Sequence, residues 1–285
     1  MTLWQPYPKA QGSTVVGDLR VWQGLHSPQL NNERDMYVWL PSDYESTTRR
    51  YPVLYMHDAQ NLFDKVNSYS GDSEWEVDET MTALTTEGLG AVVVALPNMR
   101  EQRGLEYCPY PFTTYEGEAV IGQGDAYVRF IIETVKPVID RTFRTQPDAP
   151  FTGIIGSSMG GLISLYGALV YPEVFGLCGA FSPAYWFGGN ALLRTAQENA
   201  DYPGRLYIDI GTREGETLTG WLGLTAEDGD HEYVRGVRDL YATVKAGGCA
   251  TMMYVEEEGA LHREAAWARR LPAALRFLLA ETRSS

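Results

Sequence analysis

Short apolar segments alternate with segments of helical periodicity over most of this 285-residue chain. The apolar segments are mostly rich in β-branched and aromatic residues, as is typical of strands buried on both faces: 52–56, 91–96, 151–155, 206–210 and 251–255. Segments with apolar residues at helical spacing lie between or after them, at 127–143, 162–169 and 264–279. Strands that alternate with helices predict an α/β fold with a mainly parallel central sheet and helices on both faces.

Two segments near the N-terminus follow a different pattern. In residues 19–26 and 35–40 the apolar side chains partly alternate with polar ones, which predicts an antiparallel strand pair. No internal repeat, low-complexity tract or Pro/Ser-rich linker interrupts the chain. We therefore expect residues 1–285 to form a single domain.

The charge and the cysteine pattern limit the possible partners. A formal net charge of −14 is repelled by nucleic-acid phosphates and anionic lipids, so neither nucleic acid nor membrane is an expected partner. The apolar runs are too short to span a bilayer, and residues 1–12 do not resemble a signal peptide. Cys108, Cys178 and Cys249 are odd in number and lack metal-ligand or redox spacing. We expect a cytoplasmic protein that needs no metal or cofactor.

The segment with the clearest chemistry reads Gly-Ser-Ser-Met-Gly-Gly at residues 156–161. It follows one of the expected buried strands and precedes an expected helix, which is the context of a G-x-S-x-G nucleophile elbow. The turn strains the backbone of its serine, so the positions two before and two after it, Gly156 and Gly160, must be small. The helix that follows offers backbone N–H groups to a developing negative charge. Ser158 is the predicted nucleophile.

A serine hydroxyl needs a base, and behind this type of elbow the acid and then the histidine follow in the chain. Two histidines follow Ser158. His262 lies shortly after the last expected strand and directly before the terminal helix, where the fold requires the base. His231 resembles a residue near the start of an exposed helix. We predict that His262 is the base.

The acid that orients the base is expected in the loop after the strand 206–210. This loop contains two carboxylates, of which Glu214 is the first candidate and Glu216 the second. Asp209 lies inside the strand and is expected to come too early in the chain. We predict a triad of Ser158, Glu214 and His262.

An oxyanion hole needs two N–H donors. The N–H of Met159, directly after the nucleophile, is the first. The second is expected from the loop after the strand 52–56, where Ala59 and Gln60 are both candidates that the sequence does not separate. His57 begins the same loop and is expected to have a structural role.

Two groups of residues are candidates for substrate binding. Arg100 and Arg103 follow an expected strand and are candidates for binding a carboxylate or a polar acyl group, with surface ion pairs to Glu101 and Glu106 as the alternative. Aromatic residues in loops near the predicted site are candidates for a pocket wall, with ordinary packing as the alternative: Tyr185, Trp186, Phe187 and Trp221.

Several stretches in a fixed order carry a family resemblance over residues 30–280. They are Tyr-Pro-Val-Leu-Tyr-Met-His-Asp-Ala-Gln-Asn-Leu-Phe-Asp at 51–64, Glu-Tyr-Cys-Pro at 106–109, Lys-Pro-Val-Ile-Asp at 136–140, Gly-Ser-Ser-Met-Gly-Gly at 156–161, Tyr-Pro-Glu-Val-Phe at 171–175 and Phe-Ser-Pro-Ala-Tyr-Trp at 181–186. Together they resemble the putative esterase family, which includes enterochelin, feruloyl and acetylxylan esterases, esterase D and mycolyltransferases. The resemblance implies an α/β-hydrolase fold, with Ser158 as nucleophile and His262 as base. It implies Glu214 as the acid, where relatives often have Asp, and Ala59 stands where relatives tend to have Gly.

The expected function is hydrolysis of a small-molecule carboxylic ester through an acyl-enzyme on Ser158. One alternative is an acyltransferase, in which an alcohol rather than water resolves the acyl-enzyme. Another is a non-catalytic binding module on the same scaffold, which the presence of serine, acid and histidine in the required order disfavours. A siderophore lactone, a phenolic ester, an acetylated sugar and a simple acyl ester all fit the sequence, and the oligomeric state is left open.

Overall fold

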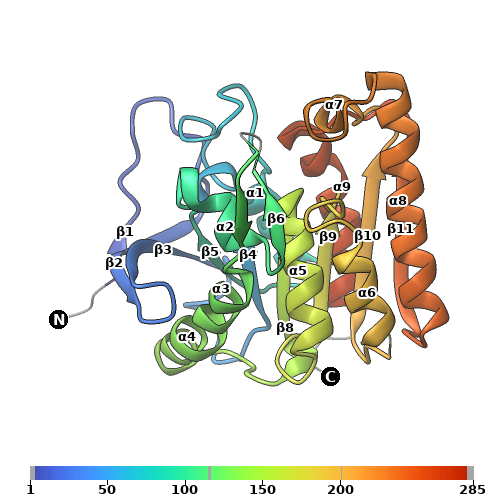
Figure 1. Cartoon of the computed structure of the whole chain (residues 1–285). Helices are drawn as coiled ribbons and strands as arrows, with labels where there is room; N and C mark the ends of the chain where they lie inside the picture. Colours follow the sequence, from blue (N-terminus) through green and yellow to red (C-terminus); the bar gives the residue numbers. More distant parts are fainter. Residues whose placement is uncertain (1–3, 115–116, 200, 281–285) are drawn as a thin grey trace.

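A central β-sheet organises the computed structural model, which describes residues 4–114, 117–199 and 201–280 (Figure 1). Nine strands follow the order β1-β2-β3-β5-β4-β8-β9-β10-β11, and β6 and β7 form a separate antiparallel pair. The strand pairs from β5 to β11 are parallel, and the pairs β1–β2, β2–β3 and β3–β5 are antiparallel. The strands are β1 (Gln5–Pro6), β2 (Asp18–Ser27), β3 (Asn32–Leu40), β4 (Val53–His57), β5 (Val92–Leu96), β6 (Pro111–Thr113), β7 (Ala119–Ile121), β8 (Thr152–Ser157), β9 (Leu177–Phe181), β10 (Arg205–Gly211) and β11 (Thr251–Glu257).

The sheet confirms the strands expected from the sequence and adds two, β1 and β9. The five strands expected to be buried are β4, β5, β8, β10 and β11, and the expected N-terminal pair is β2–β3. The expectation of burial on both faces is wrong for β11, which is half-buried because it lies at the edge of the sheet. Every residue of β4, β5 and β8 is buried, because both faces of the sheet are covered. Of the two added strands, β9 is buried between β8 and β10 although it has no β-branched residue.

Helices cover both faces of the sheet, as expected (Figure 1). Consecutive residues of β5 point to opposite faces: Val93 joins a core with α1 and α9, and Val94 joins a core with α3, α5, α6 and α8. Among the described residues, no helix combines the length and the apolar character that crossing a membrane requires. The helices are α1 (Val77–Thr86), α2 (Arg103–Tyr107), α3 (Gly124–Phe130), α4 (Lys136–Thr142), α5 (Met159–Val170), α6 (Ala191–Glu198), α7 (Glu216–Leu222), α8 (Ala226–Ala246) and α9 (Glu264–Leu279).

The structure divides one expected helix into two, and it extends another helix beyond the residues recognised in the sequence. The segment expected as one helix at 127–143 is divided into α3 and α4 by a π-helical turn, Ile131–Val135. Pro137 follows this turn and has no N–H to donate to the preceding turn, so regular α-helical bonding is interrupted there. Only the beginning of α8 was recognised in the sequence, where Thr225 caps the helix by accepting from the Asp228 N–H at 3.1 Å.

The parallel strands bring the predicted site residues to one edge of the sheet. The loops after β4, β5, β8, β10 and β11 all leave from the carboxyl ends of neighbouring parallel strands. Ligand sites of parallel α/β sheets form at this edge. The helix α9 begins directly after the last of these loops, so its first turns also reach the edge.

Candidate active site

Ser158 occupies a sharp turn between β8 and α5. Its backbone dihedral angles are φ 56° and ψ −122°, a conformation that costs a non-glycine residue about 1–3 kcal/mol. The Ser158 N–H donates to the Phe181 carbonyl at 2.9 Å, and the Ser158 carbonyl accepts from the Ala184 N–H at 3.0 Å. The loop after β9 therefore holds the strained turn in place.

Of the two glycines that flank Ser158, only one is required by close packing. A Cβ atom on Gly156 would lie 2.8 Å from the Gly160 carbonyl and 2.8 Å from the His57 ring. A Cβ atom on Gly160 would meet nothing closer than 3.4 Å, from an Asp58 carboxylate oxygen. The expectation that both positions must be small is therefore too strict for Gly160.

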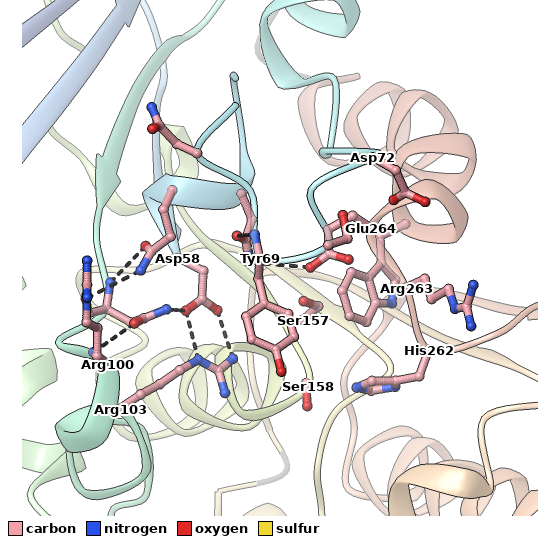
Figure 2. Close-up of a pocket in the computed structure, with 16 residues that line it drawn as sticks. Asp58, Tyr69, Asp72, Arg100, Arg103, Ser157, Ser158, His262, Arg263 and Glu264 are labelled. Carbon is pink, nitrogen blue, oxygen red and sulfur yellow. Dashed lines mark hydrogen bonds and ion pairs between the residues drawn. The ribbon is translucent and has the colours of Figure 1, made fainter. Parts of the chain in front are cut away.

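A cavity of about 1110 Å³ opens beside the turn and is lined by both Ser158 and His262. Figure 2 shows the His262 ring directed toward Ser158, with Arg100 and Arg103 on the opposite side of the serine. Ser157, the neighbouring hydroxyl, also lines the cavity but is more deeply buried than Ser158. The structure thus brings the predicted nucleophile and the predicted base to one cavity.

The imidazole of His262 is held on three sides. Its Nδ1 lies 2.6 Å from Glu214 Oε2, so a carboxylate there accepts the Nδ1 proton. The ring packs edge-on against Trp267, with centroids 4.9 Å apart, and beside Tyr233 at 5.8 Å. An imidazole with its proton on Nδ1 leaves Nε2 free to accept a proton in the cavity.

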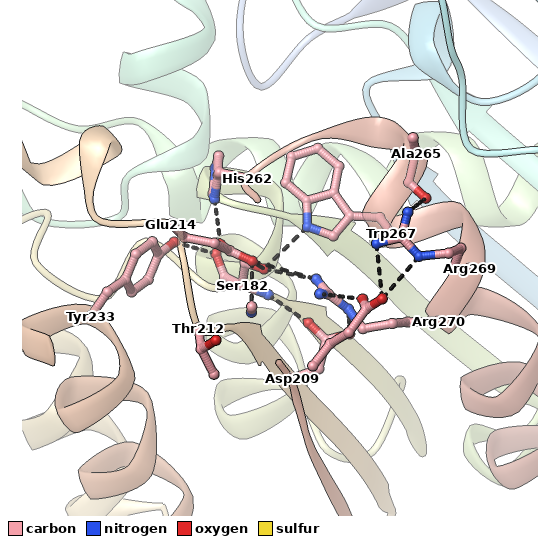
Figure 3. Close-up of polar contacts among 12 residues, drawn as sticks. Ser182, Asp209, Thr212, Glu214, Tyr233, His262, Ala265, Trp267, Arg269 and Arg270 are labelled. Atoms are coloured by element: carbon pink, nitrogen blue, oxygen red, sulfur yellow. Dashed lines mark hydrogen bonds and ion pairs between the residues drawn. The ribbon is translucent and has the colours of Figure 1, made fainter. Parts of the chain in front are cut away.

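The three acids considered for the site have different surroundings, and Figure 3 shows two of them, Asp209 and Glu214. Glu214 is buried and contacts the His262 ring, whereas Glu216 is exposed in the first turn of α7. Asp209 is fully buried within β10 and pairs with Arg270 at 2.7 Å. Burial, only partly offset by Arg270, raises the pKa of Asp209 to about 6. Only Glu214 among these three acids is bonded to the imidazole.

A network of side chains fixes the loop that carries the predicted second oxyanion donor. Asp58 has a left-handed backbone, φ 58°, and precedes the short 3₁₀ turn Ala59–Asn61. Its carboxylate accepts two hydrogen bonds from Arg103, at 2.8 and 2.9 Å, and one from Asn98 at 2.6 Å. Burial alone would raise the pKa of Asp58, but Arg103 and Asn98 hold it below its ordinary value. The Gln60 side chain accepts from the Asn98 N–H at 3.1 Å, which ties the loops after β4 and β5 together.

The candidate oxyanion donors belong to two segments, the elbow itself and the turn after β4. Met159 is the first residue of α5, where helix N–H groups have no partner within the helix. Ala59 and Gln60 belong to the 3₁₀ turn after β4, and Gln60 also lines the cavity. His57, at the end of β4, is buried and bonded to Tyr127, and burial lowers its pKa to about 3, so it is neutral at physiological pH.

The two candidate arginines line the cavity, but one of them has a different partner from those considered in the sequence. Arg103 pairs with Asp58, not with Glu101 or Glu106. Glu106 is instead buried in an ion pair with Arg34 at 2.7 Å. Arg100 is exposed at the cavity.

The candidate aromatic residues lie outside this cavity. Tyr185 packs against α8, and its hydroxyl donates to the Glu232 carbonyl at 3.0 Å. Trp186 packs edge-on against Tyr233, with ring centroids 4.7 Å apart. Trp221 lies over Phe187, with centroids 4.7 Å apart, beside a second and smaller hollow. These contacts are those of ordinary packing, which was the alternative to a pocket wall.

One acidic group could hold a metal ion in the part of the chain that the structure describes. Glu74, Asp78 and Glu79 have carboxylate oxygens within 4.8 Å of one another. Burial raises the pKa of Glu74 to about 7, and that of Asp78 is also raised by burial. None of these three residues lines the cavity beside Ser158, so they are not placed to act on a molecule bound there.

Several site residues were not recognised in the sequence. Ser182, Trp267 and Arg270 surround Glu214 and His262, and Asp58 supports the loop after β4. Ser182 and Asp58 lie in stretches that carry the family resemblance, so a signal for them was present. Arg270 carries a weaker signal: it is a charged residue next to Leu271 on the apolar face of α9.

A family model and several known proteins match this chain. The model of a family described as putative esterase matches residues 27–278. The uncharacterized protein YbbA of Bacillus subtilis is 24% identical over 269 residues, which cover 92% of this chain and 99% of YbbA. The siderophore hydrolase EstA from Aspergillus nidulans has a similar structure, with a TM-score of 0.72 at 17% identity over 93% of this chain and 95% of EstA. An IroE-like serine hydrolase from Shewanella oneidensis has a TM-score of 0.71 at 16% identity over 94% and 82% of the two chains.

The sheet order, the covering helices and the structural neighbours define an α/β-hydrolase fold. Within this class the protein is a serine esterase. The family match extends over most of the sequence, and the chain belongs to the putative esterase family.

Proposed function

We propose that this esterase hydrolyses carboxylic esters through an acyl-enzyme on Ser158, with His262 as base and Glu214 as the acid of the triad. The observation that carries the proposal is the 2.6 Å contact between His262 Nδ1 and Glu214 Oε2, on an imidazole that shares one cavity with Ser158. The contact supports a proton on Nδ1, which would leave Nε2 to take the serine proton.

The reaction follows from these positions. Ser158 Oγ attacks the ester carbonyl carbon while His262 Nε2 accepts the hydroxyl proton. The negative charge on the carbonyl oxygen is stabilised by the N–H of Met159 and by that of Ala59 or Gln60. The tetrahedral intermediate collapses, and His262 returns the proton to the leaving alcohol. Water then attacks the acyl-enzyme with His262 as base again, which releases the acid and restores Ser158.

The polarity of the cavity supports an ester that carries polar groups. Uncharged hydrogen-bonding side chains line much of it: Gln60, Asn61, Asn67, Ser70 and Asn98. Charged residues of both signs also line it, and among the described residues Tyr69 and Trp267 are its only Phe, Tyr or Trp side chains. Such side chains can form hydrogen bonds and ion pairs with polar groups of an ester. An ester that carries polar groups is therefore the substrate class that we propose.

We further propose a cytoplasmic location. All three cysteines are buried and carry free thiols. Free thiols are favoured in a reducing compartment. Fractionation of cells that express the untagged protein tests this assignment, and recovery in the secreted fraction would contradict it.

The proposed nucleophile is tested with a fluorophosphonate probe and a short-chain p-nitrophenyl ester. We expect the probe to form an adduct on Ser158, detected by mass spectrometry of the labelled peptide. Ser158→Ala is expected to abolish labelling and to lower ester turnover by several orders of magnitude. The matched control is Ser157→Ala, which removes the neighbouring hydroxyl and should be much milder. Equal losses in the two variants, or an active Ser158→Ala, would refute the assignment.

A further inference from the structure

Ser182 lies behind the triad, away from the cavity. It is fully buried, follows β9 directly and does not line the cavity with Ser158, so it cannot itself act as a nucleophile on a bound ester. Its hydroxyl contacts Glu214 Oε1 at 2.8 Å, the oxygen that does not face His262 (Figure 3).

The direction of the Ser182 hydroxyl proton is determined by its other neighbours. Trp267 Nε1 and Arg270 Nη2 each donate to Ser182 Oγ at 3.1 Å. An indole N–H and a guanidinium have no acceptor atom, so both lone pairs of the hydroxyl are occupied by donors. The single O–H of Ser182 must then donate to Glu214.

The same donation constrains Glu214 in turn. Oε1 accepts from the Ser182 hydroxyl and from the Gly211 N–H at 2.7 Å, and the Arg270 guanidinium lies 3.6 Å away. Two donors and a nearby cation set the orientation of the carboxylate. Its other oxygen, Oε2, can then only accept from His262 Nδ1.

The backbone of Ser182 is held as firmly as its side chain. Its N–H donates to the backbone carbonyl and to the carboxylate of Asp209, both at 3.0 Å. Its carbonyl accepts from the Tyr233 hydroxyl at 2.5 Å. These contacts keep the residue at φ 42°, a value that is unfavourable for a residue with a side chain. A strained residue held from every side at a functional site is a candidate for a role in function.

We propose that Ser182 is a positioning residue that orients the Glu214 carboxylate and thereby keeps the His262 proton on Nδ1. Trp267 and Arg270 contribute by orienting the Ser182 hydroxyl. This inference rests on the proposed function, because it assigns Ser182 a part in the same triad. Ser182 itself touches neither the substrate nor Ser158 Oγ through its hydroxyl; it acts through Glu214.

The test uses Ser182→Gly in the full-length protein. Glycine suits the φ of 42° and keeps the backbone hydrogen bonds, so this variant removes the hydroxyl without adding strain. Arg270 is a poorer target, because its removal would leave the buried Asp209 without its ion-pair partner and could prevent folding. The matched control is Ser164→Ala, which removes another fully buried hydroxyl, bonded only to the Gly160 carbonyl at 2.7 Å.

We expect Ser182→Gly to lower kcat by about 10- to 100-fold, the effect of losing one hydrogen bond to a charged group. KM should stay within about twofold, since Ser182 makes no contact with the cavity. The proton of the His262–Glu214 hydrogen bond should give a downfield ¹H NMR signal in the wild type, absent from His262→Ala. That signal should be lost or broadened in Ser182→Gly and retained in Ser164→Ala.

The possible failures can be told apart. If the wild type hydrolyses esters and labels on Ser158 but folded Ser182→Gly keeps its kcat and its downfield signal, this inference is wrong and the proposed function stands. A rise in KM with kcat unchanged would also overturn it. If the wild type neither labels nor hydrolyses any ester, the proposed function fails and the positioning role fails with it.

Discussion

At the scale of single residues, the contacts of Glu214 distinguish it from every other acid near the cavity. Its two carboxylate oxygens have different hydrogen-bond partners: Oε2 contacts His262, and Oε1 accepts from Ser182 and Gly211. Glu216, two residues later, is exposed at the start of α7. The pair therefore offers a direct comparison between two neighbouring glutamates.

We expect Glu214→Gln to lower kcat by up to about 10⁴-fold, because an amide N–H facing Nδ1 favours the wrong imidazole tautomer. Glu216→Gln should keep most of the activity, since its side chain is exposed. Steady-state hydrolysis of the same short-chain ester by both variants measures the difference. Equal activity of the two variants would remove Glu214 from the triad.

At the scale of elements, the junction of β8 with α5 determines where the nucleophile lies. The close approach at this junction is between Gly156 in the strand and Gly160 in the helix, with the His57 ring beside them. Backbone atoms cannot move aside as the end of a flexible side chain can. The two glycines should therefore respond to substitution in opposite ways.

Gly156→Ala is expected to destabilise the protein by about 1–3 kcal/mol or more, because its Cβ would lie 2.8 Å from the Gly160 carbonyl. Gly160→Ala should be neutral or stabilising by up to about 1 kcal/mol, since alanine favours a helix and its Cβ fits. The free energies of unfolding from urea titrations give the comparison. Similar destabilisation by both variants would contradict the packing described for Gly156 and Gly160 at this junction.

At the scale of the whole molecule, the hydrophobic core on one face of the sheet, packed against α3, α5, α6 and α8, contains all three thiols. Cys108 and Cys178 are fully buried and Cys249 is 4% exposed. Burial raises the pKa of the Cys108 thiol to about 11, which lowers the fraction of reactive thiolate further. Reaction of these thiols therefore reports on opening of the fold.

We expect Ellman's reagent to react slowly with the native protein and to titrate all three thiols once urea unfolds it. The unfolding transition should coincide with that seen by circular dichroism. A reductant should leave the melting temperature unchanged, because no disulfide is present among these cysteines. Fewer than three reactive thiols after unfolding would contradict this expectation.

The position of the site followed from the sequence because the order of strands, turns and helices is a local property of the chain. The elbow around Ser158 and the helix from Glu264 onward were recognisable from spacing alone. The resemblance to the family pointed to the same serine and histidine. The roles of Ser158, His262 and Glu214 stay predictions until the variants are measured.

Only the tertiary structure decided which side chains meet, because those pairs are far apart in the chain. Arg103 binds Asp58 rather than a neighbouring glutamate, and the aromatic residues near Trp186 pack on α8 rather than in the cavity. The strand β9 contains no β-branched residue, and it forms a strand because β8 and β10 supply its hydrogen bonds. Local propensity determines which segments form helices and strands. Burial and hydrogen bonding between distant segments determine which side chains contact one another. Ser182 illustrates this: it was visible in the sequence as part of a shared stretch, and its contact with Glu214 exists only in the folded chain.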